Sequence, residues 1–145
     1  MTTAMITTAG REASLQILTS GYTPAGPRTV ILMGDGHDFG TDPSTVADIA
    51  SGELVATNYA RQLLAFDPPS TDASGVTSQK SQPLSFGLVG GAVDAKVSGC
   101  YVFEGSGNDA TSPVTACVQF VEAKTTDGTE LILRPVSWVW SPTVF

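Results

Sequence analysis

The sequence predicts a mainly β fold: an antiparallel β-sandwich or barrel of about seven or eight strands, with one N-terminal helix and a short second helix. Short apolar or alternating stretches, separated by glycine, proline and asparagine, recur from residue 28 onward. The 145 residues include 18 threonines and 14 serines, and only 14% are charged, against a usual share of about a quarter. This composition suits pleated surfaces and turns, and the length fits one domain, residues 1–145.

The N-terminal helix is expected over about residues 4–18. Apolar side chains recur there at steps of three and four residues, which is typical of a helix with one buried face. The recurring positions are Ile6, Ala9, Ala13 and Ile17. Gly10 weakens such a helix by about 1 kcal/mol relative to alanine, so we expect the helix to depend on packing against a larger element.

The β domain is expected over about residues 28–140, followed by an extended C-terminal tail, 141–145. It opens with a continuous apolar run at 29–33, which predicts a buried strand. A glycine- and aspartate-rich loop follows. It leads into the short second helix, because Asp42 is a good N-cap and Pro43 fits the first helical position.

Further strands are expected from alternation and from β-branched or aromatic content. They cover residues 58–66, 83–88, 96–103, 114–121, 130–134 and 136–140. Residues 67–83 are rich in proline, serine and threonine and predict a long loop or an irregular hairpin. The turn signature Thr126-Asp127-Gly128 predicts a hairpin between the strands at 114–121 and 130–134.

The charge balance argues against nucleic acid as a partner. Seven basic residues against fourteen acidic ones give a net charge of −7 and a pI near 4.3, which does not suit a phosphate-binding surface. Six of the seven net negative charges lie between Asp35 and Asp72, so one surface should be acidic. No stretch approaches the roughly 18 apolar residues of a membrane span, and the first 21 residues lack the pattern of a signal peptide. We therefore expect no membrane partner and no Sec-type export.

The sequence gives little support for a catalytic function. His37 is the only histidine, and a Ser-His-Asp or Cys-His device would have to be built around it. Its simplest role is that of a loop residue making one hydrogen bond. Cys100 and Cys117 are too few for a disulfide scaffold and lack metal-ligand spacing, so we interpret them as small apolar residues in strands. The sequence predicts no enzyme and no cofactor.

Asp35, Asp38 and Asp42 are the candidate metal ligands, because calcium takes six to eight oxygen ligands from flexible loops of this composition. Their spacing is not that of an EF-hand, and the terminal bidentate glutamate is missing. The favoured interpretation treats these aspartates as turn formers and helix caps.

Trp138 and Trp140 stand two residues apart, so on a strand both side chains point to one face. They either pack in the core or form an exposed aromatic patch for protein or carbohydrate contact. The final segment, Ser-Trp-Val-Trp-Ser-Pro-Thr-Val-Phe, carries no charge. If this tail has no partner in the monomer, a neighbouring subunit would cover it.

A family resemblance adds to these observations. The dipeptide Gly-Glu at 52–53 and the strand at 58–66, which contains Tyr59-Ala60-Arg61-Gln62, resemble an element of small virion structural proteins of tailed bacteriophages. The N-terminal helix, the apolar strand at 30–33 and Leu-Ser-Phe at 84–86 look similar too, so the resemblance covers roughly the first 90 residues. It implies a non-enzymatic capsid or tail component without catalytic residues.

These observations together lead to an expected function. The protein would be a capsid decoration (cement) protein that binds and stabilises the head shell of a virion assembled in the host cytoplasm. Its partners would be the major capsid protein or other virion proteins, and copies of itself, as a trimer. The alternatives are a tail connector, fibre-attachment or baseplate component, or a carbohydrate-binding β-sandwich module. The interface candidates are Tyr59, Arg61, Trp138, Trp140 and Phe145, and Arg61 is also expected to pair with an acidic loop.

Overall fold

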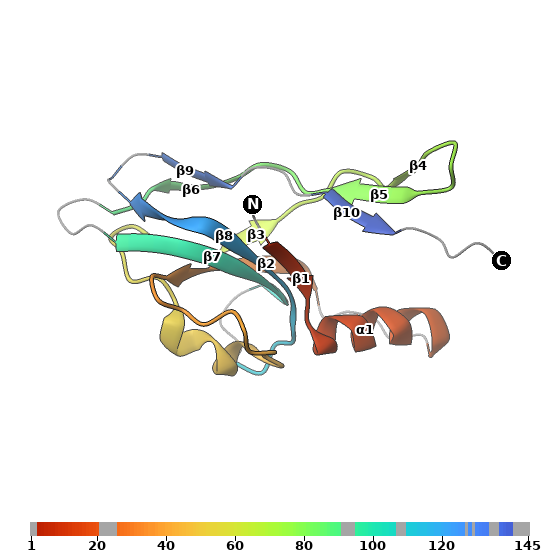
Figure 1. Ribbon diagram of the computed structural model, residues 1–145, viewed down its shortest axis with the longest axis horizontal. Coiled ribbons are helices and arrows are strands. Elements are labelled where there is room, and N and C mark those ends of the chain that lie inside the picture. Colours follow the sequence, from red (N-terminus) through yellow and green to blue (C-terminus); the bar gives the residue numbers. More distant parts are fainter. Residues whose placement is uncertain are drawn as a thin grey trace.

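The computed structural model confirms a mainly β chain with one α-helix and several antiparallel sheets (Figure 1), with 48% of residues in strands and 15% helical. It describes residues 3–20, 26–90, 95–106, 110–126, 128, 130–133 and 137–140. For residues 3, 18, 133 and 137–140 it describes the backbone alone. No helix in these ranges has the length and apolar content needed to cross a membrane.

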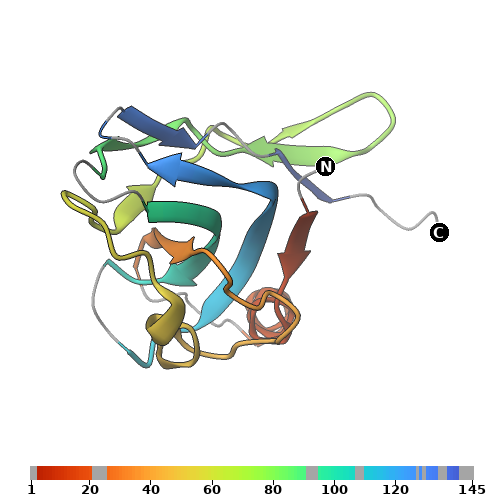
Figure 2. The same ribbon diagram turned by 60° about the vertical axis from the view of Figure 1, so that its left-hand side comes forward.

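A five-stranded antiparallel sheet forms the body of the molecule. Its strands, in spatial order, are β1 (Thr3–Ile6), β8 (Val114–Thr126), β7 (Ala95–Glu104), β2 (Arg28–Gly34) and β3 (Gln62–Leu64). The pairing of β7 with β8 shifts register at two places, and such bulges bend a strand and increase its twist. Figure 2 shows the resulting curl of the sheet.

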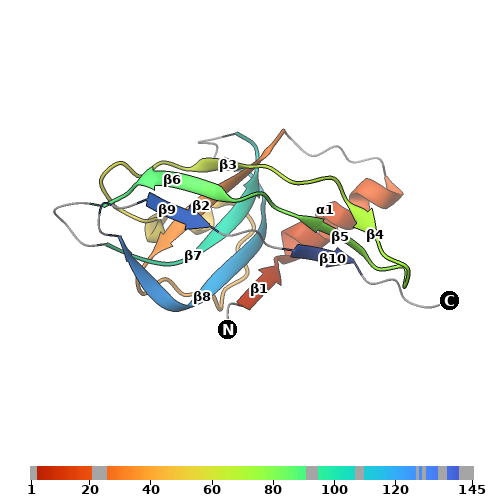
Figure 3. The same ribbon diagram turned by 90° about the horizontal axis from the view of Figure 1, so that it is seen from above.

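Two smaller sheets complete the fold. Strands β6 (Leu84–Leu88) and β9 (Glu130–Leu133) pair with each other. Strands β4 (Ser70–Thr71), β5 (Thr77–Lys80) and β10 (Ser137–Trp140) form a three-stranded sheet in the order β10, β5, β4, which we call the arm. The arm extends beyond the body on the same side as α1 (Thr8–Thr19) (Figures 1 and 3).

Apolar side chains are buried on both faces of the large sheet, which explains the continuous apolar run in β2. Val30 and Leu32 face one way, toward Leu84 and Phe86 of β6. Ile31 and Met33 face the other way. They pack with residues of the loop and turns after β2, namely Phe39, Val46 and Ile49. The covering of both faces makes the architecture sandwich-like.

The helix starts later than predicted. Residues 4–6, which the sequence places in the helix, belong to β1 (Thr3–Ile6) and pair with β8. Thr7 is the N-cap and accepts a hydrogen bond from the Gly10 backbone N–H at 3.0 Å. A Cβ at Gly10 would overlap the backbone of Thr115 in β8, so glycine at this position lets the helix lie directly on the sheet.

The second helix differs from the prediction in its start and its type. Two 3₁₀ turns, η1 (Val46–Asp48) and η2 (Ala50–Gly52), replace it. The N-cap of η1 is Thr45 rather than Asp42, and the Asp48 carboxylate accepts from the backbone N–H groups of Ser44 and Thr45. Asp42 caps α1 instead: it accepts from the Thr8 backbone N–H at 3.0 Å and from the Thr8 hydroxyl.

Two strand predictions need correction. Of residues 58–66, only Gln62–Leu64 (β3) form a strand, which pairs with β2. Phe66 makes an isolated bridge to Ser81, and Asn58 adopts φ 60°, outside the β region. The predicted hairpin at residues 126–128 does not form: β9 pairs with β6, and the Gly128 N–H donates to the Val89 carbonyl. Residues 67–83 contain the β4–β5 hairpin, so the hairpin alternative is confirmed, and the strand count in the described residues rises to ten.

Candidate interaction surface

Glu53, Tyr59 and Arg61 form a hydrogen-bonded cluster beside β2. The Arg61 guanidinium donates through Nε to Glu53 Oε1 at 2.9 Å and through a terminal nitrogen to Glu53 Oε2 at 2.8 Å. The Tyr59 hydroxyl donates to Glu53 Oε1 and accepts from the Leu32 backbone N–H, both at 3.0 Å. The cluster therefore ties the loop after η2 and the start of β3 to a buried strand, and the predicted ion pair of Arg61 with an acidic loop is confirmed.

The cluster is largely shielded from water. The side chains of Arg61 and Glu53 are 17% and 23% exposed, and the Arg61 guanidinium lies 5.6 Å from the centre of the Phe103 ring. Hydrogen bonding to Glu53 raises the pKa of Arg61, and burial raises the pKa of Tyr59. Both residues keep their protonated forms and direct their polar atoms inward, so their described role is to stiffen the surface. Their role as interface residues stays a prediction.

Two of the candidate calcium ligands act as a turn former and a cap. Asp38 Oδ1 accepts from the Gly40 backbone N–H at 2.8 Å, and Asp42 caps α1. The hydrogen bonds from Thr8 hold the pKa of Asp42 below its usual value. Asp35 lies exposed in the turn after β2. Across the ranges that the structure describes, no three His, Cys, Asp or Glu side chains lie close enough to hold a metal ion.

His37 packs against the core beneath the same loop. Its Nε2 lies 2.9 Å from the Tyr101 hydroxyl, and its ring meets the Phe39 ring edge-on at 4.8 Å. Burial lowers the pKa of His37, which favours the neutral imidazole. The predicted role of a loop residue with a hydrogen bond is confirmed.

Cys100 and Cys117 are free thiols on opposite faces of the large sheet. Cys117 stands opposite Tyr101 in the β7–β8 pairing, whereas Cys100 stands opposite Val118. Because neighbouring residues of a strand alternate between faces, the two sulfurs point into different apolar clusters. Burial raises the pKa of Cys100 to about 12. The interpretation of both cysteines as small apolar core residues is confirmed.

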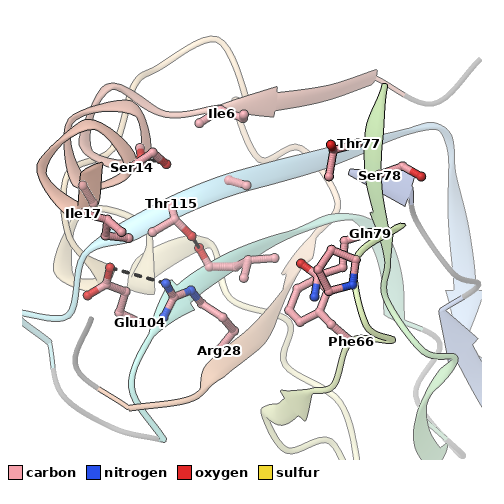
Figure 4. Close-up of a pocket in the computed structure, with 15 residues that line it drawn as sticks. Ile6, Ser14, Ile17, Arg28, Phe66, Thr77, Ser78, Gln79, Glu104 and Thr115 are labelled. Atoms are coloured by element: carbon pink, nitrogen blue, oxygen red, sulfur yellow. Dashed lines mark hydrogen bonds and ion pairs between the residues drawn. The ribbon is translucent and has the colours of Figure 1, made fainter. Parts of the chain in front are cut away.

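A groove of about 600 Å³ separates α1 from the arm (Figure 4). One wall comes from α1, through Gly10, Ala13, Ser14 and Ile17. The opposite wall comes from β5, Phe66 and Pro69, and the floor includes Val102 and Ala116 of the large sheet. The floor thus continues the apolar sheet face that β6 covers over the rest of the body.

An ion pair closes the inner end of this groove. The Glu104 side chain is 1% exposed, and its Oε1 lies 3.7 Å from a terminal nitrogen of Arg28, whose side chain is 26% exposed. The Arg28 guanidinium is therefore the accessible member of the pair. It can donate hydrogen bonds to an occupant of the groove.

Exposed apolar side chains border the groove. Ile6 and Ile17 line it and are 50% and 44% exposed, whereas Met5, which pairs with Cys117, is 39% exposed on the opposite face of the sheet. Met5 and Ile6 belong to β1, the outer strand of the large sheet. Edge strands commonly carry charged residues that block pairing with other chains. The sequence of β1, Thr-Ala-Met-Ile, contains no charged residue. The groove and β1 therefore form one accessible, mostly apolar surface.

The aromatic interface candidates lie next to this surface in the backbone register. Trp138 and Trp140 pair with Gln79 and Thr77 of β5, two residues that line the groove. The side chains of both tryptophans, and all of Phe145, lie outside the described residues. The sequence predicted the helix and the 67–83 hairpin separately, but it held no signal that would place them on either side of a groove.

Comparison with protein-family models, curated proteins and solved structures finds no significant match for this chain.

Proposed function

We propose that this protein is a non-enzymatic structural protein of a bacteriophage virion, a decoration protein that binds the head shell as a homo-oligomer, a trimer, and stabilises it. The observation that carries the proposal is the apolar groove between α1 and the arm together with the apolar outer strand β1. Apolar surface of this kind is costly to leave in water and marks sites of protein contact. We propose a virion protein because the segment around Tyr-Ala-Arg-Gln resembles small virion structural proteins.

The distribution of charge supports an assembly role. Most of the net charge lies between residues 35 and 72, whereas the described side chains that border the groove are apolar or uncharged apart from the paired Arg28 and Glu104. Contacts made through the groove and β1 would desolvate few charges, which keeps the cost of association low. A stable contact would bury on the order of 800 Å² on each partner.

The polar side chains described above form hydrogen bonds within the chain, which agrees with an assembly role. Tyr59 and Arg61 donate hydrogen bonds to Glu53, and Asp42 caps α1. A protein that fits neighbours by shape benefits from a surface held in one conformation, because less conformational entropy is then lost on binding.

Binding to particles tests the proposal directly. Purified protein would be added to virions that lack it, and the particles would be pelleted and then heated while genome release is monitored. We expect saturable binding at a fixed number of copies per particle and a higher temperature of genome release. The absence of binding to heads, or binding to isolated tails alone, would overturn the decoration role, and the second result would favour the tail alternative.

A further inference from the structure

We propose that the groove between α1 and the arm binds residues 141–145 of a second copy of this chain, so that neighbouring subunits are joined by exchange of the segment that follows β10. The inference deepens the proposed function and rests on it for the oligomeric setting. It makes the contact between subunits directional, with a donor segment on one copy and an acceptor groove on the next.

The acceptor side is shaped for a narrow apolar segment. The helix residues that line the groove are spaced three and four apart, so they share one face of α1. Ala13 and Ser14 are small, which leaves room between the helix and β5, and Gly10 lets the helix lie against β8. Ile17 is 44% exposed at this wall, and an occupant would remove it from water.

The donor side has matching chemistry. Residues 141–145 read Ser-Pro-Thr-Val-Phe and carry no charged side chain, in a chain with a net charge of −7. Val144 and Phe145 supply the apolar side chains that such a groove would bury. A proline, here Pro142, restricts the backbone of an unbound chain, which lowers the entropy lost on binding. The exposed Arg28 guanidinium at the inner end of the groove can donate to carbonyl oxygens of an extended segment.

The direction of β10 favours a second copy over the chain's own groove. Ser137 pairs with Lys80 and Trp140 pairs with Thr77. Lys80 is next to the body, because Ser81 bridges to Phe66, whereas Thr77 lies toward the outer end of the arm. The strand therefore carries the chain outward, away from Val102 and Ala116 on the groove floor. The five residues after Trp140 span at most roughly 17 Å when extended, so the acceptor groove of the second copy has to lie within that distance of the end of β10.

Matched charge substitutions test this contact. Ile17→Glu places a charge in the groove, whereas Leu15→Glu places the same charge on the same helix at a side chain that is 61% exposed and does not line the groove. Phe145→Asp alters the donor, and its control is Val55→Asp, at a side chain that is 89% exposed and lies neither in the donor segment nor in the groove. In sedimentation velocity runs we expect the unaltered chain and both controls to associate. Ile17→Glu and Phe145→Asp should weaken association at least tenfold while their thermal unfolding stays unchanged.

Mixing separates exchange from other modes of association. A donor–acceptor contact is heterologous, and it closes into a ring, such as a trimer, when the rotation between subunits allows it. An equimolar mixture of the Ile17→Glu and Phe145→Asp chains therefore retains one intact contact per pair and should form a dimer that neither chain forms alone. Association of Ile17→Glu or Phe145→Asp at the strength of the unaltered chain would overturn the proposal, as would a mixture that stays monomeric.

Crosslinking identifies the acceptor. A photoreactive benzoylphenylalanine at position 145 in ¹⁵N-labelled chain would be irradiated in the presence of unlabelled chain. We expect mixed-isotope crosslinks to the peptide that contains Ala13 and Ile17, whereas crosslinks only within one copy would overturn the inference. Particle binding, measured separately, distinguishes failure of the two proposals. A ring that does not bind virions refutes only the decoration role. A monomer that binds them refutes the exchange and the trimer, but not the decoration role.

Discussion

Removal of the charge on Glu53 provides the sharpest test of the cluster that stiffens the surface. In the substitution Glu53→Gln the shape is retained, but the carboxylate that accepts three hydrogen bonds, two from Arg61 and one from Tyr59, is lost. A glutamine offers only one carbonyl oxygen as acceptor, and its NH₂ group, itself a donor, would face the donor groups of Arg61 or Tyr59. Arg61, 17% exposed, would then remain charged and partly buried without its counter-charge.

The expected cost follows from these contacts. Hydrogen bonds to charged groups contribute about 1.5–3 kcal/mol each, but the partial exposure of both side chains and the remaining carbonyl reduce the total. We expect Glu53→Gln to lower the free energy of unfolding by about 2 kcal/mol, which for a chain of this length lowers Tm by roughly 6 °C. Urea unfolding at pH 7 measures the first quantity and calorimetry the second.

Two comparisons make this prediction refutable. Glu130→Gln alters an exposed carboxylate with one described side-chain hydrogen bond, to Ser85, and should change stability by less than about 0.5 kcal/mol. A double-mutant cycle of Glu53→Gln with Arg61→Met should give a coupling energy above about 1 kcal/mol. If Glu53→Gln matched Glu130→Gln, or if the two changes were additive, the cluster would not hold the surface as described.

Three further predictions concern the helix contact, the acid range and the thiols. Gly10→Ala should destabilise the fold by about 2 kcal/mol in urea unfolding, because the added methyl overlaps the β8 backbone, whereas Ala13→Gly, with no such overlap, should cost about 1 kcal/mol. Hydrogen bonds lower the pKa of Asp42 in the folded chain, so its contribution to stability is present above about pH 4 and is lost as the pH falls through the lowered value. Asp42→Asn should therefore lower Tm at pH 7, and a Tm gap that did not narrow below pH 4 would contradict this assignment. Cys100, with its pKa raised to about 12 by burial, should resist iodoacetamide at pH 8 until urea unfolds the chain. Mild oxidation should form no Cys100–Cys117 disulfide. Mass spectrometry of tryptic peptides would detect alkylation of Cys100 in the folded chain or a Cys100–Cys117 disulfide, and either result would contradict the prediction.

The elements that the sequence predicted well are those whose signal is local. The apolar run at 29–33 marks β2 because both faces of that strand are buried. The alternation at 83–88 marks β6 because one face packs on the large sheet and the other meets water. In each case the side-chain pattern records the burial of the strand itself.

The errors arose where a distant partner decides the conformation. The sequence predicts a helix at residues 4–6, but their pairing with β8, more than 100 residues away, makes them part of a strand. The Thr-Asp-Gly turn after β8 predicts a hairpin, but β9 pairs with β6 instead. Local propensity is a weak guide against such tertiary contacts.

The same distinction holds for the interaction surface. The pairing of Arg61 with an acidic loop was predictable, because Glu53 lies only eight residues away in the chain. The groove was not predictable from the sequence, because it is lined by α1, β5 and β7, which are far apart in the chain. Only the fold brings these three segments together.

A cryo-electron microscopy reconstruction of intact virions that carry this protein tests the central claim most directly. The claim is that the chain works by fitting other protein subunits through the groove and β1. It predicts density for this fold at symmetric positions on the outer shell, with the groove and the β1 edge buried against protein. Density elsewhere on the particle, or on the shell with the groove and β1 open to solvent, would contradict the account.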